Sequence, residues 1–375
     1  MLPTFYQTHL QKQLAPAQFI LLTILLNLIQ SEKQVRLERL SRVFPYPITT
    51  ESRRRKLQRF LDLPHLTISL IWFPLITYCR VGTRLSIAID RSQWGPINLF
   101  MVSLICPRRA IPLYWSLLPK LGNSNFESQT INLQQVLPLF SEYKVIVLGD
   151  REFCSVDLGN WLREKGVSFC LRLKKNHCIE TEHLVWKRLD ELEIVPGTSL
   201  YFQGKRVRKT RPATGFDVAC KWKRNYGGWK VDEAWFILTD LGSLPAAINA
   251  YKQRMGIEEM FRDCKTGGYD LEGTSLKGDR LINMILLMTR SYSSGIFQGT
   301  EMRKKQVQKY VSRRKEPKKR YRIRSTFGVG LDGEKWVNYL EQYSDEVEQL
   351  MKLTPSKRRF YQQGMRAATL IQSIS

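Results

Sequence analysis

Three acidic residues that lie far apart in the sequence are the first candidates for chemistry. Asp90 follows the alternating residues Leu85, Ile87 and Ile89, and Asp150 follows a continuous apolar run, as at the ends of two strands. Three converging carboxylates suit Mg²⁺, which prefers oxygen ligands. A pair of such ions about 4 Å apart can cleave a phosphodiester. An aspartate at the end of a strand is, taken alone, more often the cap of a turn or helix.

The third acid, Glu258, stands in the stretch Tyr251 to Gly273. Read as one helix, this stretch places Tyr251, Arg254 and Lys265 on the same side as Glu258. Arg and Lys can hold phosphate oxygens, and a Tyr hydroxyl can hydrogen-bond to them. The alternative is a solvated helix face with ion pairs between successive turns, which is common. Spacing alone does not separate these two interpretations.

The elements that must position these residues follow an α/β order. Residues 85–94 read as a strand ending in Asp90, and two more apolar runs, residues 97–106 and 110–118, suggest an antiparallel meander. A helix from about residue 129 to 143, a buried strand at 145–148, a helix at 156–165 and a strand at 167–175 complete the order β-β-β-α-β-α-β. This order predicts an RNase H-like core, with a mixed five-stranded sheet flanked by helices.

The N-terminal 80 residues are predicted to be helical. An apolar helix covers residues 17–30, Pro45 and Pro47 end a second helix, and a third begins with a Thr/Ser/Glu capping pattern. The third helix carries the consecutive cations Arg53, Arg54 and Arg55. Such a module can read DNA through phosphates and base edges. The alternative, a solvated helix packed on the rest of the protein, is equally compatible with the pattern.

A long basic segment separates Asp150 from Glu258. Residues 176–240 contain alternating runs punctuated by glycines, which predict a small β-strand subdomain. Its cations are interleaved with aromatic residues, a composition that suits DNA with an unstacked base. Trp235 sits in an apolar run and is expected to pack in the core.

Charge and apolar run lengths restrict the class of partner. The chain has 59 Lys+Arg against 34 Asp+Glu, a net charge of +25, and residues 303–324 alone carry twelve cations and one acid. Such an excess favours polyanions through counterion release, with nucleic acid first and an anionic membrane surface second. The apolar runs 19–29, 66–78 and 281–288 are shorter than the ~20 residues needed to span a bilayer.

Cysteine usage indicates a reduced compartment. The seven cysteines include no CxxC pair, and no signal peptide is evident, so a cytoplasmic location is expected. Cys170, His177, Cys178 and His183 lie close in sequence, but their spacing matches no standard zinc motif.

The pattern Y-x2-R-x3-E-x6-K, with Ile before the Glu and Phe-Arg three residues after it, resembles the signature of the DDE transposases of bacterial insertion sequences. It is most similar to the group named after insertion sequence four, the YREK-signature group. Asp150, Arg151 and Glu152 match that family's Asp-Arg-Glu pattern around the second aspartate. Many members carry Trp after the Arg, where this chain has Met255.

The resemblance implies an RNase H-like catalytic domain, here residues 81–300, in which residues 176–240 are an insertion. It implies an N-terminal DNA-binding region at residues 1–80 and leaves a basic helical C-terminal region at 301–375. Asp90, Asp150 and Glu258 are then the catalytic and metal-binding triad, with two Mg²⁺ ions that Mn²⁺ can replace. Tyr251, Arg254, Lys265, Arg53, Arg54, Arg55 and Trp229 are the expected DNA contacts.

The expected function is that of a transposase in a prokaryotic, nucleoid-associated setting. It would bind the terminal inverted repeats of an insertion sequence, cleave the DNA at the element ends and join the 3′-hydroxyl ends to target DNA. The expected partners are double-stranded DNA and a second copy of the chain, with no membrane and no small-molecule substrate. Two alternatives stay open: an RNase H-like DNA nuclease without strand transfer, and a non-catalytic DNA-binding derivative.

Overall fold

The computed structural model describes residues 10–64, 66, 84–106, 109–181, 185–226, 229–230, 232–265, 267–313 and 324–374. The chain divides into two compact units, one made of Met1–Pro74 with Asp263–Ser375 and the other of Leu75–Arg262. We call them the helical unit and the sheet unit. The expected catalytic domain, residues 81–300, therefore spans parts of both units, and the expected N- and C-terminal regions share one unit. The reason is a long helix, α10 (Gly278–Lys304), that packs against both α2 and α12.

The sheet unit is built on the five-strand core expected from the sequence. Strands β3 (Arg109–Leu117), β2 (Ile97–Cys106) and β1 (Arg84–Trp94) form an antiparallel meander. Strands β4 (Lys144–Gly149) and β5 (Ser168–Arg172) then lie parallel to β1, in the order β3-β2-β1-β4-β5. Residues Ile87 to Ile89 and Val147 to Leu148 are fully buried, because the central strands are covered on both faces. This mixed sheet with flanking helices confirms the RNase H-like fold class.

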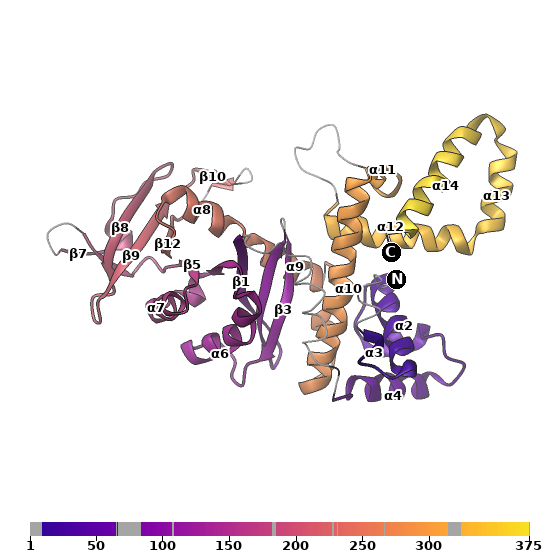
Figure 1. Cartoon of the computed structure of the whole chain (residues 1–375), viewed down its shortest axis with the longest axis horizontal. Helices are drawn as coiled ribbons and strands as arrows, with labels where there is room; N and C mark the ends of the chain where they lie inside the picture. Colours follow the sequence, from indigo (N-terminus) through magenta and orange to yellow (C-terminus); the bar gives the residue numbers. More distant parts are fainter. Residues whose placement is uncertain are drawn as a thin grey trace. The chain divides into compact units, whose positions relative to one another are not determined.

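Two helices of the core lie between its strands in the sequence and pack on the sheet (Figure 1). Helix α6 (Phe126–Val136) contacts β2 and β3, and α7 (Val156–Glu164) contacts β5 and β12. Asn125 and Ser155 cap them by accepting hydrogen bonds from the backbone N–H groups of Ser128 and Leu158. The expected helix at 129–143 begins earlier and ends as a 3₁₀ turn, Leu137–Phe140, because Pro138 interrupts the α-helical ladder.

The insertion extends the core sheet. Strand β12 (Trp235–Thr239) pairs antiparallel with β5, and β9 (Ala213–Lys221), β8 (Ser199–Val207), β6 (Cys178–Glu180) and β7 (Trp186–Arg188) follow in that order. A 3₁₀ turn, Leu189–Glu191, follows β7. Among the described strands, β10 (Asn225–Tyr226) and β11 (Trp229–Lys230) form a hairpin separate from the main sheet. The expected β-strands are present, but most of them continue the main sheet because β12 supplies β5 with a partner on its open edge.

The helical unit has α10 at its centre (Figure 1). It contacts α2 (Pro16–Glu32) and α4 (Thr50–Leu61) from the N-terminal segment, and α11 (Gln308–Val311) and α12 (Thr326–Gln342) from the C-terminal one. Helix α3 (Leu37–Val43) packs on α2 and α4, and α13 (Ser344–Leu353) and α14 (Arg358–Gln372) contact α12. Glycines let α10 and α12 touch backbone to backbone: a Cβ on Gly299 would lie 1.9 Å from the carbonyl oxygen of Thr326, and one on Gly330 would lie 1.9 Å from that of Gly295.

The three N-terminal helices agree with the sequence prediction, and α4 is capped by Thr49. Among the described helices, none is both long enough and apolar enough to cross a bilayer. Most of the apolar run 66–78 and much of the basic segment 303–324 lie outside the described residues. The described cysteines are free thiols.

Candidate active site

Asp90 and Asp150 occupy equivalent positions on two neighbouring parallel strands. The last pair of the β1–β4 ladder is Ala88 with Leu148, and each aspartate follows two residues later. The two carboxylates therefore emerge at the same end of adjacent strands, where functional groups of α/β sheets gather. Asp90 does not end its strand, as the sequence suggested. Strand β1 continues to Trp94 because β2 pairs with it as far as Trp94–Ile97, beyond the point where β4 ends.

An ion pair joins the residues that follow these aspartates. The Nε of Arg91 lies 2.9 and 3.0 Å from the two carboxylate oxygens of Glu152, and both side chains are nearly buried. Glu152 also accepts hydrogen bonds from the backbone N–H and the hydroxyl of Ser124. Asp150 accepts a hydrogen bond from the N–H of Glu152 and caps the 3₁₀ turn Arg151–Phe153. These contacts hold the end of β4 to β1 beside both aspartates.

Glu258 stands on a separate helix from Tyr251, so the expectation of one continuous helix from Tyr251 to Lys265 was wrong. Helix α8 (Leu244–Lys252) carries Tyr251, and α9 (Met255–Cys264) carries Glu258. The backbone between them turns tightly, with hydrogen bonds from the N–H groups of Arg254 and Ile257 to carbonyls three residues earlier. Such three-residue spacing breaks the α-helical ladder and redirects the chain.

The direction of α9 is set by its packing on β2 and β3. A Cβ on Gly256 would lie 3.1 Å from the backbone carbonyl carbon of Arg109, so the helix approaches the strand more closely than most side chains allow. Arg109 pairs with Glu259 at 2.6 Å, and Ser103 donates a hydrogen bond to the sulfur of Met260. These contacts place Glu258 on the same unit as Asp90 and Asp150.

Arg254, in the turn between the helices, links two of the three acids. Its Nη1 lies 3.5 Å from Oδ2 of Asp90, and its Nη2 donates a hydrogen bond to Oε1 of Glu258. The residue is only 8% exposed, and its guanidinium lies over the Tyr251 ring, 5.8 Å from the centroid. The Tyr251 ring packs edge-on against Trp235, and its hydroxyl has no hydrogen-bond partner among the described residues.

The charges of Asp150, Glu258 and Arg254 all act on Asp90. Burial raises the pKa of Asp90 to about 7, and the nearby charges of Asp150 and Glu258 also raise it. The positive charge of Arg254 and a hydrogen bond from the N–H of Arg91 oppose this rise. Burial likewise raises the pKa of Tyr251. A cluster of carboxylates that favours extra positive charge is a suitable environment for a cation.

The donor chemistry of this cluster fits a hard divalent ion. All three candidate ligands are carboxylates, the class of ligand that Mg²⁺ and Mn²⁺ accept. In the described part of the chain, no three His, Cys, Asp or Glu side chains already stand close enough to hold one ion together. Arg254 supplies the positive charge between Asp90 and Glu258 in this arrangement.

Part of the chain is similar to a known family. Residues 128–294 match the family model of the transposase DDE domain. The match covers less than half of the chain and contains Asp150 and Glu258, whereas Asp90 lies before it. None of the curated proteins matches the chain. Matching solved structures include that of the piggyBac transposase synaptic complex with hairpin DNA, at 12% identity and a TM-score of 0.40. That match covers 79% of this chain and 61% of the other, so the chain spans about three fifths of that transposase's length.

A pocket of about 680 Å³ begins beside Asp150, at Arg151, and its charged lining is mixed, with Asp190, Asp232 and Glu233 among the lining residues. Arg151 and Arg172 share the carboxylate of Glu233, at 2.7 and 2.6 Å, and line this pocket with Lys175. Trp222 and Trp235 are its aromatic walls. Sequence reasoning missed Arg172 and Glu233, because one lies inside a strand and the other lies in a loop, and only sheet pairing brings them together.

The expected DNA contacts fall into three groups: the arginines of α4, Lys265 of the helical unit, and the residues of the sheet unit. Arg53 donates hydrogen bonds to the carbonyls of Arg42 and Phe44, so it holds a turn, whereas Arg54 and Arg55 are solvent-facing and pair with Glu51. Lys265 follows the end of α9, belongs to the helical unit and pairs with Glu272 at 2.7 Å.

Of the expected residues on the sheet unit, Arg254 and Tyr251 lie at the acids. Trp229 lies in the β10–β11 hairpin, and its side chain is outside the described part of the structure. Sequence reasoning also missed Arg91. Its position directly after Asp90 could have indicated that it pairs with Glu152, which lies two residues after Asp150.

Proposed function

We propose that the protein is a DNA transposase that cleaves the ends of an insertion sequence and joins them to target DNA. The observation that carries the proposal is the equivalent register of Asp90 and Asp150, with Glu258 joined to Asp90 through Arg254. The match of residues 128–294 to the transposase DDE domain supports it. The net charge of +25 supports a polyanionic substrate.

In this proposal Asp90, Asp150 and Glu258 hold two Mg²⁺ ions, which Mn²⁺ can replace. When bound, the ions supply an activated nucleophile and stabilise the charge on the leaving oxygen. Arg254 moves from the carboxylates to the phosphate of the cleaved strand. Tyr251 is 3% exposed, so its part is to position Arg254 through the ring contact. The Arg91–Glu152 pair keeps the two aspartates at neighbouring strand ends.

The remaining parts of the proposal concern DNA and assembly. Arg54 and Arg55 on α4 contact the terminal repeat, and Lys265 and Trp229 contact DNA near the cut. Two copies of the chain bring two element ends together, so the active form is a homodimer. The protein acts in the cytoplasm on nucleoid DNA and uses no small-molecule substrate.

A cleavage assay tests the proposal. The substrate is duplex DNA ending in the inverted repeats that flank the gene, with Mg²⁺. Asp90→Asn, Asp150→Asn and Glu258→Gln should each abolish cleavage and retain DNA binding in a mobility-shift assay. Glu142→Gln, which removes an exposed acid of the same unit, is the matched control and should cleave normally. Cleavage that survives in the three variants would overturn the assignment.

The same assay separates the two alternatives. A second, unrelated duplex in the reaction receives the cut 3′ ends if the protein is a transposase, and remains intact if the protein is a nuclease. A wild-type protein that binds the repeats without cutting them would be a DNA-binding derivative.

A further inference from the structure

A carboxylate of the sheet unit lies where a phosphate would fit. Oε1 of Glu233 is 2.7 Å from Nη1 of Arg151 and 2.6 Å from Nη2 of Arg172. Two guanidinium groups therefore converge on one anionic oxygen. Arginine suits carboxylates and phosphates alike, because its planar group presents several N–H donors in a fixed arrangement. The same two side chains can hold a phosphate oxygen in the place of the Glu233 carboxylate.

Strand register places Arg172 at the end of the sheet that carries the acids. The β4–β5 ladder ends one residue before Asp150 and Arg172, which therefore stand on neighbouring strands at the same level. Asp90 stands at that level on β1, on the other side of Asp150. Parallel strands lie about 4.8 Å apart, so Arg172 is about one strand spacing from Asp150 and about two from Asp90. A phosphate held by Arg172 would lie close to the acids.

An aromatic contact also joins the Arg172 site to the acids. Trp235 lines the pocket that begins at Arg151, and it packs edge-on against Tyr251 with ring centroids 5.1 Å apart. The guanidinium of Arg254 lies over the same Tyr251 ring. Burial raises the pKa of Tyr251, and the positive charges of Arg254 and Arg172 oppose this rise. Both arginines therefore act on one aromatic residue.

The ion pairs of Glu233 are open to exchange. Glu233 lies in the loop before β12, and its side chain is 40% exposed, while that of Arg151 is 49% exposed. Exposed ion pairs contribute little to stability, because water screens them. The Arg91–Glu152 pair at the same end of the sheet is nearly buried and is the structural one. A phosphate can therefore replace Glu233 with little loss of folding stability.

The charges of the pocket balance while Glu233 is in place. The described residues that line it include three cations and three acids, namely Arg151, Arg172, Lys175, Asp190, Asp232 and Glu233. A balanced pocket attracts a polyanion weakly, and the departure of one carboxylate makes it cationic. The position of Glu233 therefore decides whether this pocket favours DNA.

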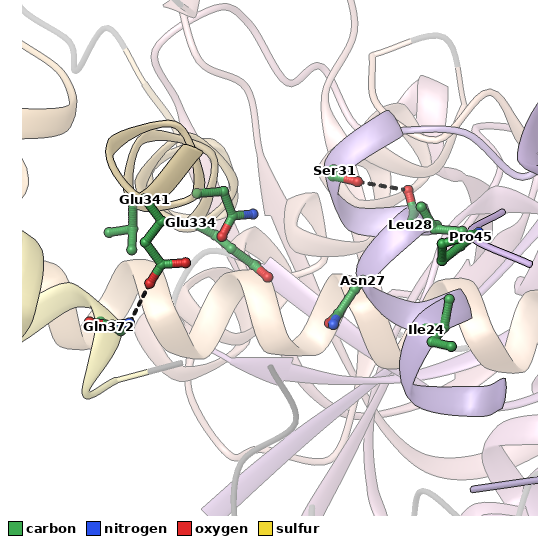
Figure 2. A pocket seen from close by; sticks show the side chains of 10 residues that line it. Ile24, Asn27, Leu28, Ser31, Pro45, Glu334, Glu341 and Gln372 are labelled. Atoms are coloured by element: carbon green, nitrogen blue, oxygen red, sulfur yellow. Dashed lines mark hydrogen bonds between the residues drawn. The ribbon is translucent and has the colours of Figure 1, made fainter. Parts of the chain in front are cut away.

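A pocket of the helical unit has the opposite chemistry (Figure 2). It measures about 340 Å³ and is lined by residues of α2, α12 and α14. Its described lining holds two acids, Glu334 and Glu341, and no cation. Glu341 accepts a hydrogen bond from the neutral amide of Gln372. That pocket would repel a phosphate, whereas the carboxylate of Glu233 already shows how an anion is held beside Asp150.

We propose that Arg151 and Arg172 bind a backbone phosphate of DNA beside the cut, and that Glu233 occupies this phosphate site until DNA displaces it. In the free protein the carboxylate keeps both arginines oriented. It also competes with DNA, because its negative charge must leave before the phosphate enters. This inference rests on the proposed function, which makes DNA the substrate.

Equilibrium binding without metal tests the proposal, because no strand is cut and affinity is read directly. A labelled duplex is titrated with the full chain in EDTA, and fluorescence anisotropy gives the Kd. Glu233→Gln removes the competing charge and should tighten binding roughly two- to fivefold. The salt dependence should steepen by about one ion, since the displaced carboxylate no longer takes up a cation. Arg172→Gln should weaken binding roughly tenfold.

Two controls separate displacement from a general effect of charge. Asp157→Asn removes an exposed acid of the same unit that pairs with Arg208, and neither residue lines the pocket. It should change the Kd by less than about twofold. In the double variant Arg172→Gln with Glu233→Gln, the tightening caused by the second substitution should fall below about twofold, because the two residues act on one site.

Circular dichroism and thermal unfolding show whether each variant is folded, and Glu233→Ala vacates the site in a second way. Unchanged or weaker binding by the Glu233 variants, or an equal gain from Asp157→Asn, would rule out the displacement. A wild type that binds no duplex would sink both proposals. Cleavage with Mg²⁺ is scored separately. A protein with the expected affinities that cuts nothing keeps the phosphate site and loses the proposed function, and one that cuts DNA while all variants bind equally does the reverse.

Discussion

Arg91 and Glu152 form an ion pair across the ends of the parallel strands β1 and β4. Arg91 directly follows Asp90, and Glu152 lies two residues after Asp150, the two aspartates proposed to bind metal. The Arg91 Nε lies 2.9 and 3.0 Å from the Glu152 carboxylate oxygens, and the side chains are only 14% and 13% exposed. The backbone pairing of β1 with β4 ends at Ala88 and Leu148. Beyond that point, this ion pair links the two strand ends directly. Its role is one of positioning, because neither group belongs to the acidic triad.

Replacing Glu152 should therefore affect both stability and cleavage. Glu152→Gln leaves Arg91 without its charged partner, so the free energy of unfolding should fall by about 2 kcal/mol. Cleavage should fall more than DNA binding, because the two aspartates lose their alignment. Urea unfolding and the cleavage assay measure the two effects. Glu301→Gln removes an exposed pair with Lys304 and should cost less than about 1 kcal/mol. Equal effects of the two substitutions would refute a special role for Glu152.

Removing Arg254 should make the sheet unit respond more strongly to Mg²⁺. Arg254→Gln takes away the positive charge between Asp90 and Glu258, so their mutual repulsion with Asp150 is no longer offset. A divalent ion then supplies the missing charge. We expect Mg²⁺ to raise the Tm of the variant roughly 2–4 °C more than that of the wild type, about 1 kcal/mol.

The control for that experiment is Arg280→Gln, which breaks an exposed pair with Asp62. Arg280 is the charged group that acts on Asp62, so Mg²⁺ should shift this variant no more than the wild type. If Arg254→Gln and Arg280→Gln respond alike, the carboxylates around Arg254 do not form a cation site.

A methyl group added at Gly256 should strain the contact of α9 with β3. Gly256→Ala places a methyl group 3.1 Å from the backbone carbon of Arg109, and backbone cannot rotate away as a side chain can. We expect a loss of about 1–2 kcal/mol in stability and a reduced cleavage rate, because Glu258 shifts with its helix. Gly328→Ala, in the first turn of α12, meets only ordinary contacts and should be neutral or stabilising. Thermal unfolding of both variants decides the point; a neutral Gly256→Ala would show that α9 is not pressed against β3.

Thiol reactivity should follow burial. Burial raises the pKa of Cys170 and of Cys220 to about 12, so at pH 9 only about one thiol in a thousand is ionised at either position. Cys178 is partly exposed. Alkylation of the native protein at pH 9, followed by peptide mass spectrometry, should modify Cys178 well before Cys170 and Cys220, and denaturation should remove the difference. Early labelling of Cys170 would contradict the described packing of β5 against β12.

The sequence by itself determined the elements and the candidate chemistry. Alternation in residues 85–94 and the apolar run before Asp150 are local signals, because burial on one or both faces of a strand fixes residue type at each position. These signals predicted the order of strands and helices along the chain, and that order indicated the fold class. Charge balance likewise follows from composition alone and indicates a polyanionic partner.

Only the tertiary structure decided how the acids are held. The register of β1 on β4, the turn at Arg254 and the approach of Gly256 to Arg109 depend on contacts between residues remote in sequence, which no local pattern encodes. The same reason explains why the helix at 251–265 was expected to be continuous: its spacing is helical throughout, and packing of α9 on the meander imposes the break. The division into two units also arises from packing, since α10 joins both ends of the chain into one core.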